Sequence, residues 1–317
     1  MSNDPRNRSL VRADDTLQQL AGDLIISRQK LKQTEGFELI RMKREQGQQT
    51  LGYSSRPFVL CGLPVRRPPK GILIWKRRNG QFLLEVTGHP DFGLPYGQDR
   101  LVPIFLATLA VRQRSQTVRF SSAAEMLDTF GLQQGGKQYR RLIAAFERIF
   151  GSTIFFGTDT QAERAKVIRR HRFNFLSDAQ LWYARDPEQR FLPGEFENSV
   201  TLSSEFYAEV SAHPIPADLE AVKAFSSFPA LLDLFMWLTY RCFSAKTEER
   251  IPLFGPYGLT NQLGITEYTR PRRFRQRLDG WLGAIRAAWP ECPAAIAPDG
   301  QVLVIAPARA IHPQPVD

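Results

Sequence analysis

The sequence is poor in the residues that build disulfide frameworks, metal centres and redox sites. Its 317 residues include three cysteines and four histidines. The cysteines are Cys61, Cys242 and Cys292, which lie far apart and form no C-x-x-C pair. Neither a disulfide framework nor a zinc site is therefore predicted, and we interpret each cysteine as a small buried side chain. The histidines lie in four separate segments, at His89, His171, His213 and His312.

Motifs for nucleotide chemistry and nucleophilic catalysis are also missing. No G-x-x-x-x-G-K-[ST] loop occurs, which argues against an ATPase. The triplet at 91–93 reads Asp-Phe-Gly, but without a glycine-rich loop or an H-R-D motif it indicates a loop rather than a kinase. A nicking enzyme would need a pair of histidines for its metal, and none is present. We therefore expect no enzymatic activity, no catalytic residue, no cofactor and no metal site.

No hydrophobic run is long enough to cross a bilayer. The most apolar stretch, FPALLDLFMWLTYRCF at 228–243, contains Asp233 and Arg241. It falls short of the about 20 apolar residues that a span requires. The first 15 residues are polar and contain no apolar signal segment. The sequence thus predicts a core helix at 228–243 and a cytoplasmic protein without a membrane partner.

The composition is that of a globular protein with a strong excess of positive charge. Lysine and arginine number 42 against 32 acidic residues, which gives a net charge of +10. Such an excess favours a polyanionic partner. The length suggests two domains. We predict an amphipathic, flexible N-terminal arm at 1–60, with leucines at helical spacing from Leu17 to Leu31, a first domain at 61–186 and a second domain at 187–317.

Both predicted domains contain the same order of elements. The first begins with a β-hairpin turning at Asn79 and Gly80, because this dipeptide suits tight hairpin turns. It then continues with a helix at 99–115, a strand at 117–122, a short helix from Ser122, a basic helix at 137–150 and a hairpin at 152–176. The second contains a strand at 199–203, a helix at 228–243, a strand at 250–254, a short helix at 257–265, a basic helix from 270 and a hairpin at 294–306.

This order indicates an internal duplication. The residues FGL at 130–132 align with LGI at 263–265, and the apolar residues of the two basic helices align as Tyr139 with Phe274, Ile143 with Leu278, Phe146 with Trp281 and Phe150 with Ile285. A helix-turn-helix followed by a hairpin is a winged helix. We predict an α+β, mainly helical fold with two winged-helix domains in tandem; the alternative is a chance similarity of amphipathic helices.

The segment TEYTRPRRFRQRL at 266–278 contains five arginines around Pro271. Proline is well placed in the first turn of a helix, where its missing N–H costs nothing. Like charges on neighbouring turns repel one another by a few tenths of a kcal/mol per pair. Binding to a phosphate backbone makes the clustered charges favourable, because each neutralised phosphate releases counterions. The alternative is an ordinary solvated charge run.

We predict a DNA-binding surface made of both basic helices and the hairpin after the first of them. In the second domain it comprises Thr269, Arg270, Arg272, Arg273, Arg275, Gln276 and Arg277. In the first domain it comprises Lys137, Gln138, Arg140 and Arg141, with Arg164, Lys166, Arg169 and Arg170 on or near the hairpin.

Several segments resemble the plasmid-encoded RepA replication proteins of Gram-negative bacteria. They are GLPYGQDRLVPIFLATLAVRQRS at 93–115, SSAAEMLDTFGLQQGGKQYRRL at 121–142, FMWLTYRCF at 235–243 and LTNQLGI at 259–265. The resemblance implies a replication initiator that binds repeated sites (iterons) in double-stranded DNA at a plasmid origin. It also implies recruitment of the host initiator and replicative helicase, and autorepression as a homodimer. The first domain is then expected either to bind DNA or to dimerise. A transcriptional repressor with the same fold is the alternative.

Overall fold

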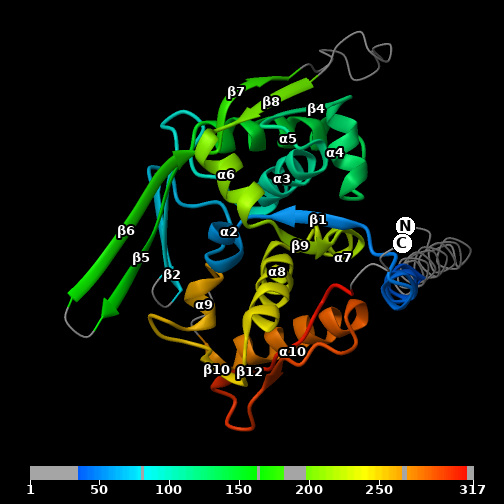
Figure 1. The fold of residues 1–317 in the computed structure, drawn as a ribbon, viewed down its shortest axis with the longest axis vertical. Coiled ribbons are helices and arrows are strands. Elements are labelled where there is room, and N and C mark those ends of the chain that lie inside the picture. The colour runs from blue at the N-terminus through cyan, green and yellow to red at the C-terminus, as the bar shows by residue number, and fades with distance from the viewer. Residues whose placement is uncertain (1–34, 80–81, 163–164, 182–197, 266–269, 313–317) are drawn as a thin grey trace, which may run out of the picture.

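The computed structural model describes residues 35–79, 82–162, 165–181, 198–265 and 270–312 (Figure 1). Helices and short antiparallel sheets gather into two groups, with a long β-ribbon extending to one side of the molecule. The fold is therefore mixed α/β. The predicted domain limits at 60/61 and 186/187 stay predictions.

The first group consists of helices around a three-stranded sheet. A 3-10 helix, η1 (Gly97–Arg100), leads directly into α3 (Leu101–Gln113), which is followed by β4 (Thr117–Phe120), α4 (Ala123–Thr129) and α5 (Gly136–Phe150). The sheet is completed by β7 (Leu176–Gln180) and β8 (Asn198–Leu202). Its order is β4-β8-β7, so the last strand of the group lies in the middle.

The second group repeats this arrangement. It contains α8 (Pro229–Ser244), β10 (Glu249–Pro252), α9 (Leu259–Gln262), α10 (Pro271–Ala288), β11 (Ala295–Ile296) and β12 (Val302–Ile305). The strand order is β10-β12-β11, again with the last strand in the middle. Each group thus contains a helix, a strand, two helices and two further strands in the same sequence and the same sheet order.

The long ribbon belongs to a separate four-stranded sheet. It consists of β5 (Thr153–Ala162) and β6 (Ala165–Asn174), and β5 also pairs with the hairpin of β2 (Ile74–Asn79) and β3 (Phe82–Thr87). The pairing of Asn79 with Phe82 confirms the hairpin predicted at this point of the sequence. The hairpin predicted at 152–176 is also present, but β7 and β8 occupy the sheet positions that β11 and β12 have in the second group.

Strand β8 lies in the range assigned to the second domain, yet it pairs with β4 and β7 of the first group. A pairing between strands this far apart in the sequence leaves no local signal, so the sequence does not indicate it.

The described part of the N-terminal arm is folded against the two groups. It comprises a helix over residues 35–45, β1 (Leu51–Ser54) and α2 (Arg56–Leu60). Strand β1 pairs with β9 (Ile215–Asp218), and Arg44 is buried, with Nε donating to Glu291 at 3.1 Å and Nη2 to the carbonyl of Arg309 at 2.9 Å. The leucines at 17–31 lie outside the described residues.

Two connecting helices complete the fold, α6 (Ser204–Ala212) before β9 and α7 (Leu219–Phe225) after it. Both begin with a residue whose side chain accepts hydrogen bonds from the first turn. Ser203 Oγ accepts from the Phe206 amide, and Asp218 Oδ1 accepts from the amides of Glu220 and Ala221. These caps satisfy backbone donors that a helix leaves unpaired at its start.

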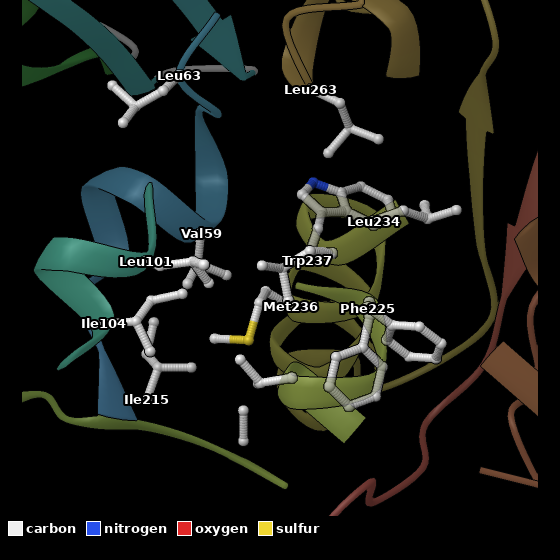
Figure 2. Packing of buried hydrophobic residues seen from close by; sticks show 14 of the residues in the cluster. Val59, Leu63, Leu101, Ile104, Ile215, Phe225, Leu234, Met236, Trp237 and Leu263 are labelled. Carbon is white, nitrogen blue, oxygen red and sulfur yellow. The ribbon is translucent and has the colours of Figure 1, made fainter. Parts of the chain in front are cut away.

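The core is continuous across both groups and centres on α8. Val59, Leu101 and Ile104 lie opposite Met236 and Trp237 of α8 (Figure 2). Trp237 is fully buried and its indole Nε1 donates to Gln262 Oε1 at 3.1 Å, which ties α8 to α9. The helix predicted at 228–243 is confirmed as a buried core helix. Within the described residues, no helix combines the length and the apolar character needed to cross a membrane.

The three cysteines are free and buried, as the sequence indicated. Burial raises the pKa of the Cys61 and Cys242 thiols to about 12. Both thiols therefore stay protonated at neutral pH, and since the thiolate is the reactive form, they act as packing groups.

A buried ion pair joins the two groups. Arg100, in η1, binds Asp233 of α8 through Nη1, and its other nitrogens donate to the carbonyls of Gly97 at 2.6 Å, Pro64 at 2.9 Å and Leu63 at 3.2 Å. Burial lowers the pKa of the Arg100 guanidinium, whereas the neighbouring charge of Asp99 opposes that change. The side chain still remains protonated at neutral pH, because an arginine titrates far above it.

Removal of one partner of this pair should destabilise the protein strongly. We expect Asp233→Ala to lower the free energy of unfolding by about 3–5 kcal/mol, because it leaves the buried Arg100 charge without its counter-ion. Glu248→Ala is the matched control, since Glu248 pairs with Arg250 at 3.9 Å on the surface, with both side chains more than half exposed. Its expected cost is about 0–1 kcal/mol. Equilibrium unfolding in urea measures both, and equal losses would contradict the assignment.

Candidate nucleic-acid interface

Helix α10 divides into a buried apolar side and an exposed basic side. It begins at Pro271, as the sequence predicted, and buries Phe274, Leu278, Leu282 and Ile285. On the exposed side lie Arg270, Arg272, Arg273, Gln276 and Arg277, whereas Arg275 is half-buried and Thr269 lies outside the described residues. Trp281 is half-buried, because Leu282 at i+4 from Leu278 takes the inward position.

The inward side of α10 is held by aromatic contacts. The ring of Phe274 meets Phe254, which precedes α9, edge to face with centroids 5.4 Å apart. Phe274 also meets Trp281 at 6.4 Å in a similar geometry. On the outer side, the Arg277 guanidinium lies 6.0 Å from the centre of the Trp281 ring, a cation–π contact that extends the side chain along the helix.

The hairpin that follows α10 lies beside its basic end. Gly300, in the turn between β11 and β12, has a φ of +66°, and a side chain at this position would collide with the Arg275 guanidinium. Arg275 therefore lies against the hairpin turn. The basic half of α10 and this turn form one continuous surface.

Helix α5 has the same two-sided character with fewer charges. Lys137, Arg140 and Arg141 are exposed and Gln138 is half-buried. The buried residues are Leu142, Ala145, Phe146 and Ile149. Of the apolar residues Tyr139, Ile143, Phe146 and Phe150 that align with α10 in the sequence, only Phe146 is buried, and Phe150 is 45% exposed. The inward stripe of α5 is set instead by Leu142, the small Ala145 and Ile149.

A partly buried arginine, Arg148, fixes the orientation of α5. Arg148 lies near the C-terminal end of α5 and donates to both carboxylate oxygens of Asp99, from Nε at 2.6 Å and from Nη2 at 2.9 Å. Its guanidinium carbon lies 4.8 Å from the centre of the Tyr96 ring. Burial alone would lower the pKa of Arg148, but its hydrogen bonds and charge interaction with Asp99 raise it above the ordinary value. The sequence identified Asp99 only as the start of a helix, because nothing local indicates a partner in α5.

The remaining predicted residues belong to the β-ribbon. Lys166, Arg169 and Arg170 lie on β6, where they pair in the backbone register with Gln161, Thr158 and Gly157. Arg164 lies outside the described residues. The structure therefore places the predicted cations on two helices and one ribbon. Among the described residues, no three histidine, cysteine or acidic side chains gather in a way that could hold a metal ion.

Three comparisons with known proteins bear on this geometry. A family model described as "Plasmid encoded RepA protein" matches residues 94–251, from η1 and α3 through α8 to the start of the second group's sheet. No curated protein sequence matches the chain.

Two crystal structures align with this chain. Domains 2 and 3 of RctB align with a TM-score of 0.50 and 15% identity, covering 78% of this chain and 94% of that one. A selenomethionine derivative of the same two RctB domains aligns with a TM-score of 0.48 and 14% identity, covering 78% and 95%. At this identity the first alignment establishes similarity of fold alone. The match confirms the resemblance inferred from the sequence, and residues 94–251 of the chain belong to the plasmid-encoded RepA protein family.

Proposed function

We propose that this protein initiates plasmid replication by binding repeated double-stranded DNA sites at the origin, with α10 entering the major groove. Family membership supports a role in plasmid replication. The observation that carries the DNA-binding part is the division of α10 into an apolar side and an arginine side. Residues 270–277 lie beyond the family match, so this part rests on physical chemistry alone.

The order of elements supports two winged-helix modules. In each group the basic helix is the last helix before the closing strands, as in a helix-turn-helix with a wing. In such modules the N-terminal half of this helix contacts base edges. In α10 that half contains Arg272, Arg273, Gln276 and Arg277, all exposed. Arginine pairs with guanine through two hydrogen bonds, which discriminates by about 1–3 kcal/mol against the wrong base.

The charges on α10 favour a polyanion over solvent. No acidic residue lies in its first turn, so the arginines there repel one another and oppose the helix dipole. Phosphates bound at this position would offset both the repulsion between the arginines and their unfavourable interaction with the helix dipole. The hairpin turn beside Arg275 would then follow the DNA backbone.

The first module contributes a second DNA contact through α5 in this proposal. Dimerisation is the other role considered for it, on account of Phe155 and Phe156. Phe156 is buried, and its ring stacks on that of Phe82 with the ring centres 5.9 Å apart. The Phe156 ring therefore packs within the protein. That observation favours DNA contact through Lys137, Arg140 and Arg141.

The rest of the proposal follows the family resemblance. The bound protein recruits the host initiator and replicative helicase, represses its own gene as a homodimer, and acts without cleaving DNA. A nicking activity would relax supercoiled origin DNA in the presence of Mg²⁺ or leave protein covalently attached, and either product would refute that last point. A transcriptional repressor would share the DNA-binding surface but would not sustain a replicon.

The double substitution Arg273→Ala and Arg277→Ala should weaken DNA binding without unfolding the protein. Loss of two phosphate or base contacts is expected to reduce affinity by roughly one to two orders of magnitude and to flatten its salt dependence. Leu278→Ala is the contrasting variant, because it empties a buried site and should cost about 2–5 kcal/mol of folding stability. Fluorescence anisotropy and urea unfolding measure the two effects. Unchanged affinity with reduced stability in the arginine variant would mean that the arginines are structural.

Footprinting on the plasmid that carries the gene should reveal several protected repeats. We expect deletion of the gene to abolish maintenance of a minimal replicon, and expression in trans to restore it. A single protected site next to a promoter, with replication unaffected by the deletion, would favour the repressor instead.

A further inference from the structure

A basic hollow lies beside α5 and joins two residues already assigned to DNA, Gln138 and Arg141, to a stretch that has not been assigned. It has a volume of about 640 Å³ and opens to solvent where three segments meet the start of α8. These segments are the stretch at 65–67, the turn at 96–98 and the connection from α4 to α5 at 131–133. Arg66, Arg67 and Arg141 line it, and none of the described residues around it is acidic.

The stretch that carries Arg66 and Arg67 is attached to a fixed base. The carbonyl of Pro64 accepts from the Gly97 amide at 2.9 Å and from Arg100 Nη2 at 2.9 Å, and Arg100 is itself held by Asp233. Two prolines, Pro68 and Pro69, follow and restrict the backbone. The two arginines therefore project from a backbone with little freedom, which lowers the entropy lost when they bind a ligand.

The third arginine approaches from α5. Gly97 has a φ of +58°. Arg141 Nη2 lies 4.0 Å from the position that a Cβ atom at Gly97 would occupy. The Arg141 guanidinium thus lies against Gly97 on one wall, while Arg66 and Arg67 lie exposed on another. Guanidinium groups on two sides of one hollow suit a phosphate group, because guanidinium pairs with phosphate in a bidentate geometry.

We propose that this hollow receives the phosphodiester backbone of the DNA strand that flanks the groove occupied by α5. The inference rests on the proposed function. Gln138 and Arg141 belong both to the exposed side of α5 and to the lining of the hollow, so a strand bordering that helix passes over it. The stretch at 65–67 then acts as a clamp on the backbone and contributes affinity without sequence preference, as phosphate contacts do.

The test uses the full-length chain and a labelled origin duplex. Arg66→Ala combined with Arg67→Ala should lower the slope of log K against log salt by about 1.8, since each lost phosphate contact removes about 0.9. Affinity at about 0.1 M salt should fall by roughly one to two orders of magnitude, to a similar degree for the origin site and for an unrelated duplex. The single variant Arg67→Ala should produce about half of the change in slope, and it keeps the test valid if the double variant does not fold.

The matched control is Lys246→Ala combined with Arg309→Ala, which removes two exposed positive charges outside the hollow. It should retain the wild-type slope to within the error of the measurement. An equal loss in this control would overturn the inference, because the effect would then reflect net charge alone.

Two further outcomes separate the inference from the proposed function. Wild-type protein that binds no DNA would refute the proposed function itself. If wild-type protein binds DNA with a steep salt dependence and the double variant has the same slope, the clamp is overturned. The proposed function is then left intact. Labelled ATP serves as a second probe: binding to wild type that the double variant loses, with an unchanged DNA slope, would identify a nucleotide site and overturn the clamp.

Discussion

The structure depends on two arginine–carboxylate pairs, one buried and one partly buried, that originate from adjacent residues. Asp99 holds Arg148 of α5, and Arg100 holds Asp233 of α8. Gly62 allows the second pair, since a side chain there would collide with the Asp233 carboxylate. A buried pair is costly to desolvate and stabilises only when its geometry is complete. The hydrogen bonds of Arg100 to three backbone carbonyls meet that requirement and fix where the two groups meet.

This arrangement connects the core to the candidate DNA-binding surface. The same short turn, η1, sets the direction of the basic helix α5, anchors the stretch before Arg66 and Arg67, and docks α8. Helix α8 in turn binds α9 through Trp237 and Gln262, and α9 precedes the basic helix α10. The orientation of α5 thus follows from a few polar contacts of η1, and α8 is joined to the helix that precedes α10.

The parts of the fold that sequence could predict are those with local signals. Asn79 and Gly80 marked a hairpin, Pro271 marked the start of α10, and the apolar stretch at 228–243 marked a core helix. The pairing of β8 with β4 and the partners of Asp99 and Arg100 join residues distant in sequence, so no spacing rule indicates them. The basic side of α10 could be predicted from its five clustered arginines, whereas the inward side of α5 could not, because its stripe includes the small Ala145.

The place of β8 in the first sheet has a consequence for synthesis on the ribosome. The central strand of that sheet follows β4, α4, α5 and the ribbon in the chain, so a nascent chain that ends before 198–202 exposes the inner edges of β4 and β7. Strand β1 stays unpaired for longer, because its partner β9 follows β8 in the chain and is synthesised later. Exposed strand edges invite association with other chains. Translation pauses ahead of β8 would therefore lengthen the period in which this protein is most prone to aggregate.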